Sequence, residues 1–375
     1  MHFNISQSAF NQLLQTVSKA VATRTPKQVL TGILLNVEET TLHATAYDLE
    51  IGIEDSLDVT PDGTLEIISP GSIVIPARYL TDVVRKLPST LLTFQVSNPY
   101  MADIRSGTAE FHLHGIDAAE FPKLPIFHSA KSLTISSLLL RQFIRSSAYA
   151  ASTLEARPTL TGIHSTLHMG QMTFTATDGL RLGMFSENIP ENPDFSWDAV
   201  IPAKSLTELT KLLPEQDMPV TLELSNSHSL FVIGKTHFYT RLIEGAYPDI
   251  SRIIPNHFGT TVRVDTAQFA NAIDRAALIA RDKENHMVRM ELQDRKITIS
   301  SNSPEIGNVS ESIETIETVG DDLVIAFNSH YVLEALRATG SDQVQVQFNG
   351  SNQPFTLHIP EEQNNLQLIS PVLMR

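Results

Sequence analysis

Two stretches of the chain share one pattern: TGILLNVEETTLHATAYDLEIGI at residues 31–53 and TGIHSTLHMGQMTFTATDGLRLGM at residues 161–184. Each begins with Thr-Gly-Ile, continues as an alternating strand, a short polar turn and a second alternating strand, and then has an aspartate and a glycine. An Asp-Gly pair alone indicates only a turn. A pattern of this length that recurs 130 positions later indicates that a larger unit of the chain is repeated.

The neighbouring segments extend the repeat and add a third copy. HMVRMELQDRKITISSNSPEIGN (286–308) keeps the strand-turn-strand pattern and the glycine, with Ser303 in place of the aspartate. A short β run and a helix of about three turns follow each copy, and their isoleucines Ile75, Ile201 and Ile325 are 126 and then 124 positions apart. These segments are SIVIPARYLTDVVRKLP (72–88), DAVIPAKSLTELTKLLP (198–214) and LVIAFNSHYVLEALRATG (323–340).

A helix also precedes each copy. The segments 13–21, 143–151 and 269–277 align without gaps and carry apolar residues at the spacing of a helix with one buried face. The residues predicted to form that face are Phe10, Leu13, Leu14 and Val17 in the first helix and Leu80, Val83, Val84 and Leu87 in the next.

These patterns predict an α+β protein of three similar domains, 1–128, 129–257 and 258–375. Each domain is expected to have two helices and roughly eight strands in the order β-α-ββββ-α-βββ. Alternating strands indicate antiparallel sheets with one buried face, onto which the two helices pack.

Composition narrows the function. The chain has no cysteine, which excludes disulfides, thiolate catalysis and cysteine-ligated metals. The N-terminus lacks the pattern of a signal peptide, and no apolar run is long enough to span a membrane, so we expect a cytoplasmic protein. The formal charge of −15 argues against tight binding of nucleic acid by the surface as a whole.

No constellation typical of an enzyme is evident, so we expect no catalytic residue, no metal and no cofactor. The thirteen histidines are scattered without metal-ligand spacing. The GKT at 234–236 lacks the earlier glycine of a phosphate-binding loop, and the sequence predicts a strand there.

Domains repeated head to tail close into a ring when the rotation between them fits. Three domains do not easily close a large ring, whereas two chains supply six domains. The repeat therefore favours a homodimer.

The sequence resembles the bacterial DNA sliding clamp, the β subunit of DNA polymerase III, over its whole length. The motifs that carry the resemblance are TGILLNV (31–37), ATAYDLEIGI (44–53), IPARYL (75–80), ATDGLRL (176–182), YPDISRIIP (247–255) and LISPVLMR (368–375). The resemblance implies a head-to-tail homodimer that encircles double-stranded DNA as a ring, with helices lining the hole. It also implies that the ring tethers DNA polymerase III for processive synthesis, and that the clamp loader and other partners bind through short peptides with Leu and Phe anchors.

Cations recur on the helices expected to face DNA. Arg78 and Lys204 occupy equivalent positions, as do Arg85 and Lys211, and the spacing of seven places both cations of a helix on nearly one side. Acidic residues concentrate in strands and loops, away from the helices expected to face DNA. Salt is expected to screen most of the repulsion between these acids and the DNA. The residues predicted to face DNA are Lys19, Arg24, Lys27, Arg78, Arg85, Arg141, Arg145, Lys204, Lys211 and Arg275, with Lys19 and Arg275 aligned to each other.

The resemblance implies a partner-peptide pocket in the second copy of the opening pattern. An apolar groove with few polar groups suits a short peptide with apolar anchors. The implied pocket residues are Leu160, Thr177, Gly179, Leu180, Arg181, Leu182, Pro248, Ile253, Leu368, Pro371, Val372, Leu373 and Met374. The chain departs from the family at Leu180, where histidine is common, and in the tail after Pro371.

Ring closure is expected to use strands at the two ends of the repeat array. Repeat symmetry points to residues 110–115 of the first domain and 308–314 of the third. The resemblance implies Phe111, Leu278 and Ile279 as interface residues.

Without the resemblance, two other classes of protein function are compatible with the sequence. A non-DNA three-domain β-rich scaffold or adhesin predicts a monomer or an open array. A nuclease or hydrolase would require a catalytic carboxylate such as Asp178.

Overall fold

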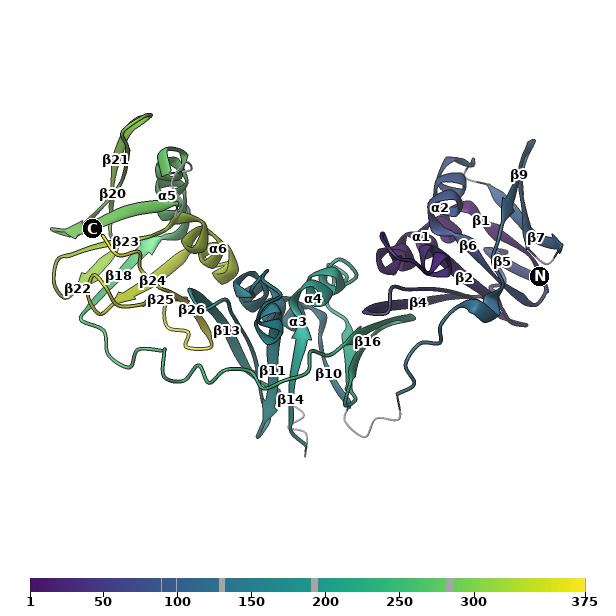
Figure 1. The fold of residues 1–375 in the computed structure, drawn as a ribbon, viewed down its shortest axis with the longest axis horizontal. Coiled ribbons are helices and arrows are strands. Elements are labelled where there is room, and N and C mark those ends of the chain that lie inside the picture. The colour runs from purple at the N-terminus through teal and green to yellow at the C-terminus, as the bar shows by residue number, and fades with distance from the viewer. Residues whose placement is uncertain (89, 99, 128–131, 190–194, 281–285, 375) are drawn as a thin grey trace. The chain divides into compact units, whose positions relative to one another are not determined.

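The structure, a computed structural model, describes residues 1–374 apart from residues 89, 99, 128–131, 190–194 and 281–285. The predicted boundary at residue 128 falls outside the described residues. Three successive sets of elements follow the order expected from the sequence (Figure 1).

Each repeat begins with a strand and a helix and contains a second helix after its next group of strands. The first repeat contains β1 (His2–Ser6), α1 (Gln7–Val17), β2 (Gly32–Val37), β3 (Thr41–Tyr47), β4 (Ile51–Asp58), β5 (Leu65–Ser69), β6 (Gly71–Pro76), α2 (Ala77–Lys86), β7 (Leu91–Asn98), β8 (Met101–Ser106) and β9 (Ala109–His114). The second contains β10 (Ser132–Ser136), α3 (Ser137–Ser147), β11 (Gly162–His168), β12 (Gln171–Thr177), β13 (Arg181–Asn188), β14 (Trp197–Pro202), α4 (Ala203–Thr210), β15 (Pro219–Leu224), β16 (His228–Ile233) and β17 (Thr236–Arg241). The third contains β18 (Thr260–Asp265), α5 (Thr266–Ala280), β19 (Met287–Gln293), β20 (Lys296–Ser303), β21 (Gly307–Glu314), β22 (Glu317–Val319), β23 (Leu323–Asn328), α6 (Ser329–Thr339), β24 (Gln343–Phe348), β25 (Phe355–His358) and β26 (Asn365–Ile369).

The first and third repeats contain one strand more than predicted. These additional strands, β5 and β22, each pair with the first strand of their own repeat and end its sheet. The described part of the second repeat has the predicted order of eight strands. The predicted strand at 234–236 is also corrected, because Gly234 and Lys235 form the turn between β16 and β17 and only Thr236 lies in a strand.

The first helix is defined by its cap and its apolar face. The Ser6 side chain accepts a hydrogen bond from the Ala9 N–H at 3.3 Å, which satisfies one free donor of the first turn. All four predicted residues of its face are buried, which confirms that prediction. Leu80 and Val84 of α2 and Leu87, the residue that follows it, are buried as predicted, but Val83 is only partly buried.

Strand pairing crosses the repeat boundaries. Strand β17 of the second repeat pairs with β4 of the first, and β26 of the third pairs with β13 of the second. The pairing builds an eight-stranded sheet, β10-β15-β16-β17-β4-β3-β2-β6, and a nine-stranded sheet, β14-β11-β12-β13-β26-β25-β24-β18-β22. Each of these sheets therefore contains strands of two repeats.

The chain consequently forms two compact units that divide the middle repeat. One unit comprises Met1–Leu138 and Glu208–Leu242, and the other comprises Leu139–Thr207 and Ile243–Arg375. The main-chain hydrogen bonds of the shared sheets explain the division, because they join each half of the middle repeat to a different neighbour.

Each terminal repeat has an aromatic or aliphatic core. In the first repeat Phe3 stacks on Phe94 at 5.0 Å between ring centroids, and Phe10 meets Phe94 edge-on at 6.2 Å. In the third repeat α5 and α6 pack against each other and cover a continuous cluster that includes Phe269 and Phe327 (Figure 1). Buried apolar area of this kind is the main stabilising contribution to each core.

Replacing Phe94 by Ala should lower the free energy of unfolding of its unit by about 3–5 kcal/mol, because the cavity would remove two ring contacts. Denaturant titration followed by circular dichroism measures the change. Leu91→Ala, on the same strand but 53% exposed, is the matched control and should leave stability within about 0.5 kcal/mol. Equal effects of the two substitutions would contradict the assigned core.

Candidate functional site

The Asp-Gly segment of the second repeat forms a tight turn between β12 and β13. The Asp178 carboxylate accepts hydrogen bonds from the N–H groups of Leu180 at 2.9 Å and Arg181 at 3.1 Å. Gly179 has φ 94°, a conformation that side chains with a Cβ rarely adopt. The turn leaves the Leu180 side chain 54% exposed at the surface.

Arg181 is the centre of a buried ionic cluster. Its guanidinium bonds to Asp178 at 3.0 Å and to Glu334 of α6, and it lies over the rings of Tyr149 and Tyr331 at 5.4 and 4.5 Å from their centroids. Burial disfavours its charge, but the Glu334 and Asp178 carboxylates more than compensate and raise the pKa of Arg181. Only 10% of the side chain is exposed.

This cluster gives Arg181 a structural role, and its place in the peptide pocket stays a prediction. Its charge is committed to two carboxylates, so it does not offer a free cation to a ligand. Instead it fixes the turn of the second repeat to helix α6 of the third. Tyr149 strengthens the same junction through a hydrogen bond from its hydroxyl to the Gln367 side chain at 2.5 Å.

Buried leucines form the floor of the predicted pocket. Leu160, Leu182 and Leu368 are all at most 5% exposed, and Leu182 pairs with Leu368 across β13 and β26. The Thr177 N–H donates to the Tyr247 hydroxyl at 3.0 Å, and the Tyr247 ring stacks on His164 at 4.8 Å. Burial raises the pKa of Tyr247 to about 12, so its hydroxyl stays protonated at neutral pH.

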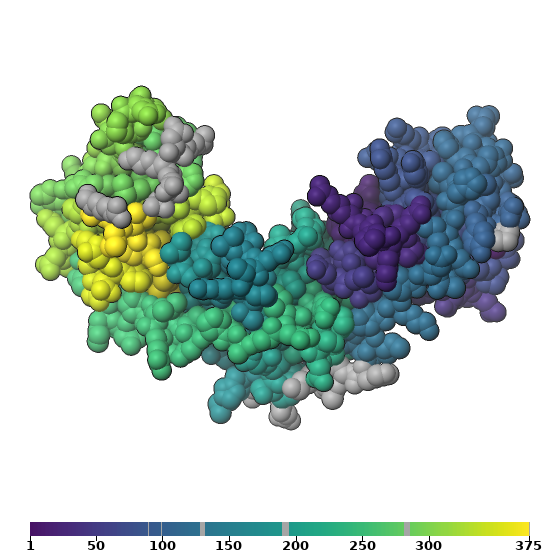
Figure 2. Space-filling view, viewed as in Figure 1, coloured from purple at the N-terminus to yellow at the C-terminus, as the bar shows by residue number. Residues whose placement is uncertain are grey.

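Other residues of the predicted pocket are exposed apolar side chains. Pro248 and Ile253 contribute from the segment after β17, and the C-terminal tail contributes Leu373 and Met374. The tail is held in place by two main-chain bonds, from Ser370 N–H to Leu180 C=O and from Val372 N–H to Ala326 C=O, both 2.8 Å. Pro371 lies between these anchors, and Figure 2 shows the yellow C-terminal segment on the molecular surface.

The predicted pocket residues all lie in one unit. We call these residues, without the largely buried Arg181, the peptide surface: Leu160, Thr177, Gly179, Leu180, Leu182, Pro248, Ile253, Leu368 and the tail 371–374. The sequence reading missed the residues that hold it, namely Tyr149, Tyr247, Tyr331 and Glu334. Only Tyr247 had a signal, because it begins the motif YPDISRIIP.

The predicted DNA-facing cations recur in register on the second helix of each repeat. Arg78 and Arg85 are the second and ninth residues of α2, and Lys204 is the second residue of α4. Lys211 follows α4 at the ninth position. The third repeat has Arg337 at the ninth position of α6, and this equivalent cation was missed in the sequence.

Several of these cations already have partners. Arg85 pairs with Asp82 at 2.6 Å and Lys211 with Glu208 at 2.7 Å, both on the surface. The Lys19 ammonium donates to the Lys211 carbonyl at 3.1 Å, and partial burial lowers the pKa of Lys19. Exposed surface ion pairs of this kind are weak, about 0–1 kcal/mol, so phosphate groups could displace them.

The remaining helix and loop cations differ in exposure. Arg24, Lys27, Arg78, Arg145 and Lys204 are exposed, whereas Arg141 is partly buried. The Arg145 guanidinium lies against Gly340, the left-handed residue that ends α6: a Cβ there would come within 2.7 Å of it. Arg145 is therefore exposed and also packs against the C-terminal end of α6.

Arg275 requires a correction. The predicted alignment of Lys19 with Arg275 is wrong by three positions, because α1 begins at Gln7 and α5 at Thr266. The residue of α5 that matches Lys19 is Leu278. The Arg275 guanidinium makes a two-pronged pair with Glu311 of β21 at 2.5 and 2.7 Å, so its charge is committed to the edge of a sheet.

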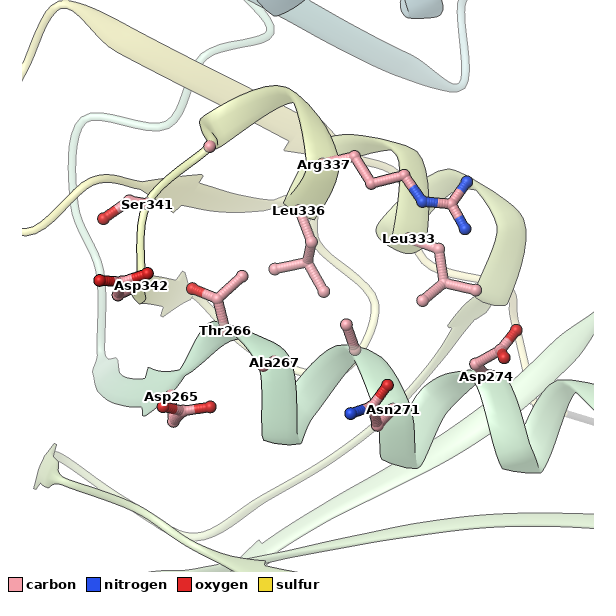
Figure 3. A pocket seen from close by; sticks show the side chains of 12 residues that line it. Asp265, Thr266, Ala267, Asn271, Asp274, Leu333, Leu336, Arg337, Ser341 and Asp342 are labelled. Atoms are coloured by element: carbon pink, nitrogen blue, oxygen red, sulfur yellow. The ribbon is translucent and has the colours of Figure 1, made fainter.

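A cleft of about 550 Å³ lies between α5 and α6, next to Arg337 (Figure 3). Leu333 and Leu336 of α6 line it from one side and Asn271 and Asp274 of α5 from the other. The described residues that line this cleft include aspartates and Arg337. This mixture of charges does not favour one class of ligand.

The predicted ring-closing strands both end their sheets. In the part of the chain that the structure describes, β9 pairs with β8 alone in the order β5-β1-β7-β8-β9, and β21 with β20 alone in the order β21-β20-β19-β23. Phe111 on β9 and Leu278 at the end of α5 are exposed apolar side chains, and Ile279 is partly buried. Unpaired strand edges are templates for pairing with another chain.

Within the described residues, no group of three or more His, Cys, Asp or Glu side chains is arranged to hold a metal ion. The same part of the chain has no helix long and apolar enough to cross a membrane.

The fold defines a repeat protein with equivalent strand junctions, unpaired strand edges and cations on equivalent helices. The chain matches the DNA polymerase III beta subunit in three parts: its N-terminal domain over residues 1–125, its central domain over 134–249 and its C-terminal domain over 251–373. It is 38% identical to the beta sliding clamp of Bacillus subtilis strain 168 over 99% of both chains. Among solved structures, it is similar to the Bacillus subtilis DNA polymerase sliding clamp with a TM-score of 0.97 and 37% identity, covering all of both chains. It also matches the DNA polymerase III beta chain of Streptococcus pneumoniae with a TM-score of 0.96 and 32% identity over the same coverage.

The chain therefore belongs to the bacterial DNA polymerase III beta subunit family, the beta sliding clamps. As a member of this family it has the function of a sliding clamp, a processivity factor of DNA replication that is not itself an enzyme. The alternative of a non-DNA scaffold or adhesin has no support from these comparisons.

Replacing Glu334 by Gln should destabilise the unit that contains the peptide surface by about 1–3 kcal/mol, because Arg181 would lose one of its two charged partners in a buried site. Thermal unfolding monitored by calorimetry measures the loss. Glu305→Gln, an exposed position in the same unit, is the control and should have no effect. An unchanged midpoint for Glu334→Gln would mean that the cluster does not hold the turn.

Proposed function

We propose that two copies of the chain pair head to tail to form a closed ring around double-stranded DNA, and that the ring tethers DNA polymerase III through the peptide surface. The observation that carries the proposal is the equivalence of the two strand junctions between repeats. Strands β17 and β4 form the first junction, and β26 and β13, their equivalents one repeat later, form the second. In the first repeat, β9 is the equivalent of β17 and β26. In the third repeat, β21 is the equivalent of β4 and β13. Both β9 and β21 end their sheets.

The two junctions within the chain indicate which residue of β9 is equivalent to the paired residues of β17 and β26. Phe238 of β17 lies opposite Phe231 of the preceding strand, and Gln367 of β26 lies opposite the equivalent residue Leu357. Phe111 lies opposite Ile104 in the same way and is therefore the equivalent residue of β9.

The residue of β21 follows by the same argument. Phe238 pairs with Ile53 and Gln367 pairs with Gly183. Ile53 and Gly183 each lie opposite the same alanine of the preceding strand, Ala46 or Ala176. In the third repeat the residue equivalent to these alanines is Ser301, two residues before Ser303, and it lies opposite Val309.

Repeat symmetry thus pairs Phe111 with Val309 of the partner subunit. In this antiparallel register the apolar residues of the two strands fall on one face, which supports it. The further pairs on that face are Leu113 with Gly307 and Ala109 with Glu311. Leu278 and Ile279 lie at the end of α5, which packs against β21, so they are placed to cover this face.

The helix cations would provide the DNA contacts. At physiological salt the Debye length is about 8 Å, so acids on strands and loops a domain's thickness away have little effect on the DNA. A closed ring stays on DNA by topology, and weak phosphate contacts through Arg78, Lys204 and Arg337 would permit sliding. No base-specific contact is required.

Partner peptides with Leu and Phe anchors would bind the peptide surface. Its buried leucine floor and exposed apolar rim suit such anchors, and Leu180 makes the rim more apolar than a histidine would. Competing partners would be DNA polymerase III, the clamp loader and other replication proteins. We further propose a cytoplasmic location, no bound cofactor, and domain boundaries near residues 128 and 257.

Retention on circular duplex DNA tests the ring. After loading by a clamp loader with ATP, the wild-type protein should co-elute with circular DNA on a sizing column and be lost after the circle is cut. Phe111→Glu should give a monomer by sedimentation and no retention, because a charge would be placed against the partner's Val309 in an apolar interface. Leu91→Glu is the matched control and should be retained. Retention of the wild type on linear DNA would mean direct binding and would refute topological linkage.

Replacing Ile253 by Asp should weaken binding of a peptide with Leu and Phe anchors at least tenfold, because a carboxylate would be placed in the apolar rim. Fluorescence anisotropy measures the affinity. Ile126→Asp, also an exposed isoleucine between repeats, should bind the peptide like the wild type. Equal affinities for both variants would place the peptide elsewhere.

A further inference from the structure

A second cavity, of about 600 Å³, lies beside the peptide surface in the same unit. We call it the flank cavity. Met184 of β13 and Leu366 of β26 line its base, and Ile254 and Phe258 from the segment before β18 line its wall. Glu361 and Glu362 lie at its rim.

The base of the flank cavity continues the floor of the peptide surface. Met184 follows Leu182 by two residues on β13, and Leu366 precedes Leu368 by two on β26, so all four side chains share one face of the sheet. Leu182, Leu366 and Leu368 form one buried cluster, against which Met184 packs. Two residues of a strand span about 7 Å, so the two sites are neighbours.

The segment between the second and third repeats borders both sites. Ile253 belongs to the rim of the peptide surface, and its neighbour Ile254 lines the flank cavity. Ile250 and Ile254 pack on the leucine cluster, so this segment separates the two openings. A ligand that uses both sites must therefore cross it.

The charge of the flank cavity is negative. Glu361 and Glu362 are exposed, and among the described residues none that lines the cavity is a lysine or arginine. His358 also lines the cavity, and burial lowers its pKa, so it is neutral at pH 7. An apolar base under two carboxylates disfavours phosphate or nucleic acid and favours a group that is apolar with a cationic end.

We propose that the flank cavity binds the residues next to the Leu and Phe anchors of a partner peptide, and that it selects a flank with one apolar side chain and a lysine or arginine. The inference rests on the proposed function of the peptide surface and specifies which peptides it prefers. A flank of four to six residues can extend roughly 13–20 Å, enough to cross the segment at Ile254.

Three synthetic peptides with blocked termini test the proposal by anisotropy. One carries the Leu and Phe anchors alone, a second adds a flank containing Leu and two Lys, and a third has two Glu in place of those Lys. Each flank is tried at either end of the anchors. With the wild-type protein, the basic flank at one end should tighten binding about threefold to tenfold over the anchors alone, and the acidic flank should not.

The double variant E361Q/E362Q should bind the anchor peptide like the wild type but lose most of the gain from the basic flank. Phe258→Ala should reduce the gain from the apolar residue of the flank and leave the anchors unaffected. D321N/D322N removes two adjacent exposed acids elsewhere in the same unit and should retain the full gain.

The outcomes separate the two proposals. If the anchor peptide fails to bind the wild-type protein, the proposed function of the peptide surface is wrong. If it binds but the basic flank gives no gain at either end, or gives a gain that E361Q/E362Q retains, the flank cavity does not have this role. A gain lost equally in D321N/D322N would indicate general electrostatic attraction and would also refute it.

Discussion

Main-chain hydrogen bonding between the edges of neighbouring repeats is the interaction on which the rest of the structure depends. Strands β4 and β17, and then β13 and β26, convert separate half-sheets into continuous ones. Such pairing depends on backbone groups, so it tolerates the sequence divergence between repeats as long as an edge stays unblocked. The same constraint locates the peptide surface, because its leucine floor crosses the junction of β13 and β26.

A second, polar constraint acts at that junction. Arg181 is buried between two tyrosine rings and two carboxylates, and its partners come from both repeats. A buried charge is tolerated only with full compensation, so the cluster requires the turn at Asp178 and helix α6 to stay in register. The apolar surface above it can then present exposed side chains on a fixed support.

The sequence predicted the repeated elements well, since strand and helix periodicity recurs at nearly constant spacing. The errors have physical causes. A shift of three residues keeps apolar positions on the same side of a helix, so α5 could be aligned wrongly without disturbing its pattern. The edge strands β5 and β22 are only five and three residues long, too short for a periodic pattern to reveal them in the sequence. The partner of Arg181 could not be found from local sequence, because Glu334 is 153 residues away.

The division of the middle repeat between two compact units has a consequence for how the chain folds as it is made. The first unit includes Glu208–Leu242, so it cannot be completed when the first repeat leaves the ribosome. Residues Leu139–Thr207 emerge before that unit is complete, yet they belong to the second unit, most of which is synthesised last. Synthesis at about 5–20 residues per second leaves this inserted segment without its final partners for several seconds. Its strands are therefore exposed to association with other nascent chains during that time.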